Sequence, residues 1–144
     1  MTGHPFQNQT KRILLVEDDL ELLTELQDFL FETGRFDVVA RENGIDALEV
    51  LKKNPRIDLI VSDYLMVGKG SDLARAAVEI GIPVIIITGN YEEAVKALRG
   101  YSLKVPVLKK PFNSHKLVEM LDHYLFGKPL NGSPVISAWW DDLK

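Results

Sequence analysis

IDLIVSDYLM, residues 57–66, decides the fold of this chain. Apolar and largely β-branched residues dominate its first half and lead directly to Asp63. Such a run is typical of a strand buried on both faces of a parallel sheet. Because parallel sheets bind ligands at the carboxyl ends of their strands, we expect Asp63 to lie ionised at the mouth of a pocket. There it would be a metal ligand, a nucleophile or a base, or else the N-cap of the next helix.

Similar apolar runs flank this strand on both sides, at residues 13–16, 36–40, 83–87 and 105–108. Helical spacing, caps and breakers predict helices between and after them, over 22–30, 44–51, 71–80, 91–99 and 113–126. Strands and helices therefore alternate, which predicts a parallel sheet with right-handed crossovers and helices on both faces. We predict one domain over 11–126, preceded by a flexible tail over 1–10 and followed by a C-terminal tail over 127–144.

The composition narrows the class of protein. A chain of 144 residues with 46% hydrophobic residues suits one globular domain. A net charge of −4 argues against wholesale binding to nucleic acid or an anionic membrane. The absence of cysteine excludes disulfides and thiolate metal sites, and no apolar run reaches the roughly 18 residues of a membrane helix. We expect a cytoplasmic protein.

Chemically active side chains follow four of the predicted strands. Carboxylates that converge on one mouth repel one another, and a hard divalent cation such as Mg²⁺ relieves the repulsion. A hydroxyl and an ammonium on the opposite side suit the oxygens of a phosphoryl group. The pattern predicts phosphoryl transfer to an aspartate, with Asp63 as the in-line nucleophile. The residues concerned are Glu17, Asp18, Asp19, Asp63, Thr88 and Lys110.

Each of these residues also has an ordinary structural explanation. Asp18 and Asp19 could cap the first helix, and we expect Asp19 to do so. Thr88 could be a β-branched strand end, and Lys110 could be a solvated surface lysine like its neighbour Lys109. Their joint occurrence at four strand ends of one sheet favours a common site.

The segments ILLVEDD, LIVSDYLM, PVIIITG and LKKPF make the chain resemble response-regulator receiver domains of two-component signalling, over residues 11–126. The resemblance implies an α/β, flavodoxin-like (βα)5 fold with a five-stranded parallel sheet in the order 2-1-3-4-5. It implies that Asp63 accepts a phosphoryl group from a histidine kinase or a histidine phosphotransfer protein. By the same resemblance, Glu17, Asp18, Asp63 and the backbone carbonyl of Leu65 hold Mg²⁺, and Thr88 and Lys110 bind the phosphoryl oxygens.

The C-terminal tail is too short to be a DNA-binding or catalytic output domain, so we expect the signal to leave the domain through a protein partner or an onward relay of phosphate. The phosphorylated chain would act on a downstream protein, or form a homodimer through its fourth and fifth helices, without direct contact to nucleic acid or membrane. It would not be an enzyme beyond self-directed phosphotransfer and slow self-dephosphorylation. A relay or sink for phosphate, and a degenerate interaction module, are the alternatives for the output.

Two departures from the family pattern concern the switch. Val107 stands where the family has an aromatic residue, and Val67 stands where it has proline. Leu65 and Asn90 occupy the loop positions that flank the path of the hydrolytic water in the family. Because Leu65 cannot orient water by hydrogen bonding, we expect slow loss of the phosphoryl group.

Two other classes of protein share an aspartate at a strand end. An aspartate-nucleophile phosphatase carries a second aspartate two places after the first, where this chain has Leu65. A nucleotide-binding flavodoxin-like protein carries a glycine-rich phosphate loop after the first strand, which this sequence lacks.

The C-terminal tail contains the adjacent residues Trp139 and Trp140. Tryptophan buries a large apolar area when it docks, so residues 135–140 are predicted to dock on the face of the fourth and fifth helices, in the same or a second copy. The glycines and prolines of this tail leave open the alternative of a disordered segment.

Overall fold

The computed structural model describes residues 10–53, 56–64, 70–130 and 136–138. The described strands are β1 (Lys11–Val16), β2 (Phe36–Arg41), β3 (Leu59–Asp63), β4 (Val84–Thr88), β5 (Pro106–Lys109) and β6 (Ile136–Ala138). The helices are α1 (Leu20–Glu32), α2 (Gly44–Lys52), α3 (Gly70–Ile80), α4 (Tyr91–Gly100) and α5 (Ser114–Phe126). Strand and helix alternate along the chain as far as α5, as the apolar runs predict.

The strands form one sheet in the order β2-β1-β3-β4-β5-β6. The first five are parallel, and the predicted order 2-1-3-4-5 is confirmed. The prediction of a five-stranded sheet needs one correction, because β6 adds an antiparallel sixth strand at the β5 edge. This strand comes from the C-terminal tail, which was predicted to be an appendage outside the domain.

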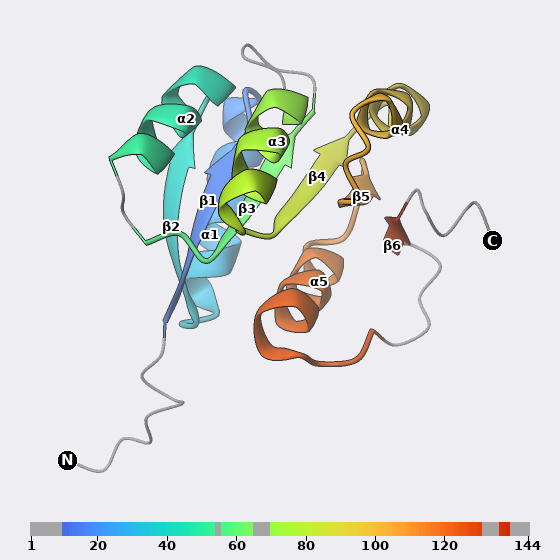
Figure 1. The fold of residues 1–144 in the computed structure, drawn as a ribbon. Helices are drawn as coiled ribbons and strands as arrows, with labels where there is room; N and C mark the ends of the chain where they lie inside the picture. Colours follow the sequence, from blue (N-terminus) through green and yellow to red (C-terminus); the bar gives the residue numbers. More distant parts are fainter. Residues whose placement is uncertain (1–9, 54–55, 65–69, 131–135, 139–144) are drawn as a thin grey trace.

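The helices cover both faces of the sheet (Figure 1). On one face, Leu26 and Leu30 of α1 and Leu117 of α5 pack against alternate residues of the central strands. On the other face, the cluster includes Ala47 of α2 and Leu98 of α4. All five residues of β3 are buried, so this strand lies in the middle of the core, as its continuous apolar run predicts.

Capping residues define where the helices begin and end. The Asp19 carboxylate accepts hydrogen bonds from the backbone N–H groups of Glu21 and Leu22, which confirms its predicted capping of α1. Asn113 caps α5 in the same way, through the N–H of His115. Gly34 follows the end of α1 with φ of 72°, a left-handed conformation that glycine adopts without a Cβ clash.

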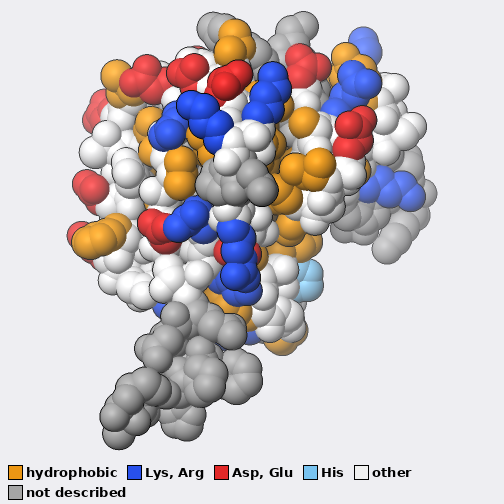
Figure 2. Space-filling view, turned by 60° about the vertical axis from the view of Figure 1, so that its left-hand side comes forward, with side chains coloured by type: hydrophobic (Ala, Val, Ile, Leu, Met, Phe, Trp, Pro, Cys, Tyr) orange, Lys and Arg blue, Asp and Glu red, His pale blue; other side chains and the backbone are white. Residues whose placement is uncertain are grey.

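The surface carries both signs of charge. Figure 2 brings the α2 side of the molecule forward and shows Lys and Arg side chains lying among Asp and Glu side chains. Among the described helices, none combines the length and the hydropathy that crossing a membrane would require.

Candidate functional site

Asp63 is the last residue of β3, so the strand carries it directly to the carboxyl edge of the sheet. Its side chain is almost fully buried, and it lies opposite Ile87 of β4 in the parallel register. The neighbouring Ser62 hydroxyl donates a hydrogen bond of 3.0 Å to the Asp63 carbonyl oxygen. β3 ends at Asp63, and the next residue, Tyr64, donates its N–H to the Ile87 carbonyl at 3.0 Å, so the position of this carboxylate is set by the core.

The acids that follow β1 lie next to Asp63. Carboxylate oxygens of Glu17, Asp18 and Asp63 lie within 4.8 Å of one another. Glu17 is fully buried and Asp18 is exposed, so the group reaches from the core to the solvent. Three oxygen donors at this spacing form an acidic group that could hold a metal ion, and they suit a hard divalent cation.

Lys110 lies over the same acids from the end of β5. Its Nζ donates a hydrogen bond of 2.6 Å to Glu17 Oε1 and lies 3.6 Å from Asp63 Oδ2. The lysine side chain is 23% exposed and that of Glu17 is fully buried, so the pair is shielded from water. The ammonium therefore offsets part of the negative charge that the carboxylates concentrate here.

The shielding and the charges shift two pKa values. Burial raises the pKa of Glu17 to about 7, and the negative charge of Asp63 adds to the rise, while hydrogen bonds from Lys110 and the Asp19 backbone oppose it. Burial alone would lower the pKa of Lys110, but its hydrogen bond to Glu17 and the charges of Asp63 and Glu17 outweigh burial and raise it. Lys110 is therefore held in its charged form beside the acids.

Thr88 is buried at the end of β4 and lies opposite Lys109 in the register. Its hydroxyl oxygen accepts a hydrogen bond of 3.0 Å from the Asn90 backbone N–H, and its carbonyl accepts one of 2.7 Å from the Lys110 N–H. Thr88 and Lys110 are thus joined through the backbone. Lys109 is exposed, as predicted.

The two loop residues that were predicted to flank the path of the hydrolytic water have different outcomes. Leu65 lies outside the described residues, as does Val67. The Asn90 side chain caps α4, accepting from the Glu93 N–H at 3.1 Å and donating to the Glu93 carboxylate at 3.0 Å. The role of Asn90 as a cap was missed in the sequence analysis, although an asparagine three places before a glutamate is a known helix-start signal.

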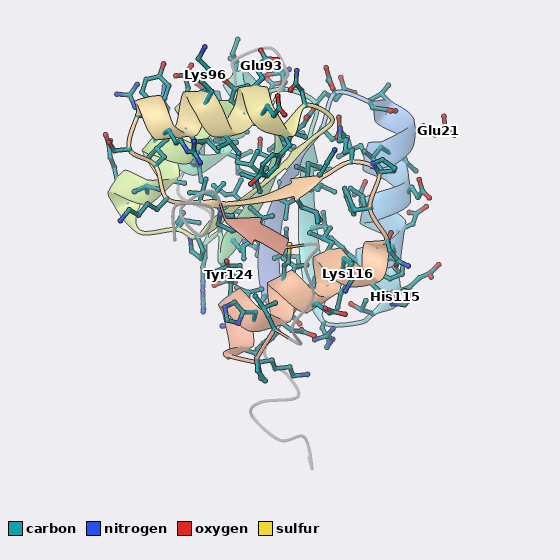
Figure 3. All side chains as sticks on the ribbon, turned by 90° about the vertical axis from the view of Figure 1, so that its right-hand side faces the viewer. Glu21, Glu93, Lys96, His115, Lys116 and Tyr124 are labelled. Atoms are coloured by element: carbon teal, nitrogen blue, oxygen red, sulfur yellow. The ribbon has the colours of Figure 1, made fainter. Side chains whose placement is uncertain are left out.

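A pocket of about 490 Å³ opens beside the acidic group, between α1 and the segment that joins β5 to α5. Lys110 lines this pocket and also contacts Glu17 and Asp63, so it lies between the pocket and the acidic group. Apolar Leu22, Leu26 and Phe112 form part of its wall, and acidic Glu21 and Glu25 stand on its α1 side. Figure 3 shows Glu21 projecting from the first turn of α1.

A doubly wound parallel sheet defines an α/β protein, and the acidic group of this chain follows β1 and β3, where the strand order reverses. The response regulator receiver domain matches residues 13–122. The chain belongs to the response regulator receiver domain family.

Relatives of known name agree with this assignment. The chain is 34% identical over 118 residues to the response regulator receiver protein CpdR of Brucella abortus, covering 80% of this chain and 97% of that protein. It is 37% identical over 110 residues to the transcriptional regulatory protein CpxR of Escherichia coli, covering 74% of this chain. The chain spans about half the length of the CpxR relatives it matches, 46% in this case.

Solved structures show the same fold. A response regulator receiver protein from Sinorhizobium medicae superposes with a TM-score of 0.69 at 32% identity, covering 81% of this chain and 95% of that one. A CheY-like receiver domain from Methanospirillum hungatei superposes with a TM-score of 0.72 at 24% identity, covering 83% of this chain and 96% of that one. The flavodoxin-like receiver fold is therefore common to all of them.

Proposed function

We propose that this chain is a phosphoacceptor switch in which Asp63 takes a phosphoryl group from a histidine kinase or a histidine phosphotransfer protein. One observation carries the proposal: the buried Asp63 carboxylate lies within 4.8 Å of the Glu17 and Asp18 oxygens and 3.6 Å from the Lys110 ammonium. The receiver domain extends over 11–126 in this proposal, with tails over 1–10 and 127–144. The absence of cysteine supports a cytoplasmic location.

The reaction is an in-line displacement at phosphorus. An Asp63 carboxylate oxygen forms a bond to the phosphorus of a phosphohistidine, the P–N bond breaks, and the imidazole leaves with its electron pair and takes up a proton. The product is an acyl phosphate on Asp63. Lys110 and Thr88 stand at the strand ends beside Asp63 and bind the phosphoryl oxygens, as a point charge and a hydroxyl donor.

The three carboxylates fit Mg²⁺, which prefers oxygen ligands. Glu17, Asp18 and Asp63 would hold it, together with the backbone carbonyl of Leu65, as the family resemblance implies. When bound, Mg²⁺ supplies positive charge to the phosphoryl oxygens. Lys110, which contacts both Glu17 and Asp63, would supply a second positive charge beside the phosphoryl oxygens.

The pocket beside Lys110 suits the protein that carries the phosphoryl group. Its apolar wall at Leu22 and Phe112 offers a contact for an apolar helix face, and Glu21 and Glu25 add negative charge around it. A donor seated there would have its phosphohistidine next to Lys110. Gly89 leaves the approach open, because a Cβ added at this residue would meet no atom within 4 Å.

The phosphorylated domain acts on a downstream protein, or associates with a second copy through α4 and α5. It does not turn over substrate in the manner of a phosphatase, since Leu65 stands where such enzymes carry their acid–base aspartate. A relay or sink for phosphate and a degenerate interaction module remain the competing assignments, and the experiment below separates the last of these.

Incubation with acetyl phosphate and Mg²⁺, followed by intact mass measurement, tests the function. We expect one phosphoryl group on the wild type and none on Asp63→Asn, which preserves size and polarity but removes the nucleophilic charge. The circular dichroism of Asp63→Asn should match that of the wild type. An unchanged adduct in the variant would refute Asp63 as acceptor, continuous release of phosphate would indicate a phosphatase, and no adduct on the wild type would indicate a degenerate module.

A further inference from the structure

The β5 edge of the sheet is covered by a strand from the C-terminal part of the chain. β6 runs antiparallel to β5, with Pro106 opposite Ala138, Val107 opposite Ser137 and Leu108 opposite Ile136. Figure 3 shows β6 beside β5, in the space between α4 and α5. Without β6, the backbone N–H and C=O groups along this edge of β5 would be open to pairing with another chain.

The same β5 strand is joined to the acceptor site along its other edge. There it pairs with β4, with Val107 opposite Ile86 and Lys109 opposite Thr88. The next residue, Lys110, donates its backbone N–H to the Thr88 carbonyl at 2.7 Å and directs its Nζ to the acids. β5 therefore has the tail strand on one edge and β4, which ends in Thr88, on the other, and it leads directly into Lys110.

β6 is short enough for its pairing to respond to a small displacement. It contains three residues, so it forms few ladder hydrogen bonds, each of small net value in water. What keeps it in place is its covalent tether, because a linked segment is present at millimolar effective concentration. The free energy difference between the docked and released states of such a strand is therefore small.

We infer that β6 is a docked strand that phosphorylation of Asp63 releases from the β5 edge. The inference rests on the proposed phosphoacceptor function. A phosphoryl group adds about −1.5 to −2 charges at Asp63 and draws Lys110 and Thr88 toward β3. Because β5 pairs with β4 at Thr88 and continues into Lys110, its carboxyl end moves with them, away from β6. The Leu108–Ile136 pair lies nearest this end and is lost first.

The release has a reciprocal consequence. If the phosphorylated state binds β6 less tightly, then loss of β6 favours the phosphorylated state by the same factor. Val107 lies on the same strand, is fully buried and carries no aromatic ring that could report the state of Thr88. The tail strand would register phosphorylation in its place.

The double variant I136P/S137P tests the docking. Successive N–H groups of a strand point alternately toward and away from the neighbouring strand, so two adjacent prolines remove a ladder donor whichever one faces β5. N131P/S133P is the matched control, because it places two prolines before β6 and leaves Ile136–Ala138 unchanged. Neither pair of substitutions touches the acceptor site.

The full chain undergoes hydrogen exchange with and without acetyl phosphate and Mg²⁺. It is then digested, and mass spectrometry measures the exchange of a peptide that contains Val107 and Leu108. Intact mass measurement of the same samples gives the fraction of chains that carry a phosphoryl group. We expect slow exchange in the unphosphorylated wild type and control, fast exchange in I136P/S137P, and a rise toward the fast value when the wild type is phosphorylated. Beryllium fluoride, a phosphoryl mimic, should bind I136P/S137P several-fold more tightly than the control.

The outcomes separate the two levels of the proposal. Equal exchange in I136P/S137P and the unphosphorylated wild type would overturn the docking. A full phosphoryl adduct with no rise in exchange would overturn the coupling and leave the acceptor function standing. No adduct on the wild type would refute the acceptor function, and the coupling with it, whereas the proline comparison would still decide the docking.

Discussion

At the scale of single residues, the Glu17 carboxylate is held tightly by its surroundings. It is fully buried, it is bonded to Lys110 at 2.6 Å, and its pKa is raised by burial from 4.5 to about 7. The raised pKa means that the folded, metal-free protein binds a proton more tightly than the unfolded chain does. Glu17 therefore adds stability that is complete below pH 4.5 and is lost as the pH rises through about 7.

This linkage predicts how metal binding depends on pH. A carboxylate must be deprotonated to act as a ligand, so Mg²⁺ affinity should fall as the pH is lowered through about 7, where Glu17 takes up its proton. Calorimetric titration with Mg²⁺ above and below this pH measures the effect. Glu17→Gln should bind Mg²⁺ more weakly at both pH values and lose most of the dependence. A wild-type affinity that is the same on both sides of pH 7 would contradict the role of Glu17.

The lifetime of the acyl phosphate depends on which loop side chains can orient water. The Asn90 side chain is engaged with Glu93 as the cap of α4, and Leu65 has no hydrogen-bonding group. We therefore expect slow self-dephosphorylation, and Leu65→Asn should shorten the phosphate half-life by several-fold. Loss of the adduct with time, followed by intact mass after removal of acetyl phosphate, measures the half-life. Equal half-lives of Leu65→Asn and the wild type would remove Leu65 from the explanation.

At the scale of the elements, α1 holds the site because its buried face anchors the turn that carries Glu17 and Asp18. Leu30 is fully buried in the cluster of α1 and α5, while its neighbour Phe31 is 76% exposed. Leu30→Ala should lower the free energy of unfolding by about 2 to 5 kcal/mol, and Phe31→Ala should change it by less than about 0.5 kcal/mol. Urea denaturation measures both. Equal effects of the two substitutions would show that α1 is not packed in this register.

Most of these elements could be predicted because their signals are local. The buried strands are continuous apolar runs, and Asp19 and Asn113 stand where helix caps are expected. The strand ends differ from the predicted ranges by a residue or two: β1 begins at Lys11 where residue 13 was predicted, and β5 ends at Lys109 where residue 108 was predicted. The ends depend on ladder hydrogen bonds to neighbouring strands, which a single sequence does not display.

Two features could not be predicted because they depend on contacts far apart in the chain. β6 is only three residues long and exists as a strand through its pairing with β5, which lies about 30 residues earlier in the chain. The hydrogen bond of Lys110 to Glu17 joins residues 93 positions apart, and from the sequence both were assigned only to the phosphoryl group or the metal. Residues 135–140 were predicted to dock on the face of the fourth and fifth helices; the structure pairs residues 136–138 with β5, and Trp139 and Trp140 lie outside the described residues.

At the scale of the whole molecule, the acceptor site and the pocket beside α1 should make different contributions to phosphorylation. A small phosphoryl donor should need only the acceptor site, whereas a protein donor should need the pocket as well. Leu22→Ala removes part of the apolar wall of that pocket without touching the acids. Phosphorylation by acetyl phosphate should be unchanged, because a small donor does not dock. Transfer from a histidine phosphotransfer protein should slow roughly tenfold, the loss expected from about 1.4 kcal/mol of docking free energy.

Timed phosphotransfer, with Phe31→Ala as the exposed apolar control on the same helix, checks this prediction. An equal loss of phosphorylation with both donors would instead indicate damage to the acceptor site. An unchanged rate with the protein donor would place the docking surface elsewhere on the molecule.

The central claim is that Asp63 carries the phosphoryl group, and borohydride trapping tests it most directly. Sodium borohydride reduces an acyl phosphate to an alcohol, which converts the phosphorylated aspartate to homoserine. After treatment with acetyl phosphate, Mg²⁺ and borohydride, peptide mass spectrometry should find homoserine at position 63, and at no other acid of the site. Homoserine at position 18 or 19, or none anywhere in a fully phosphorylated sample, would contradict the account.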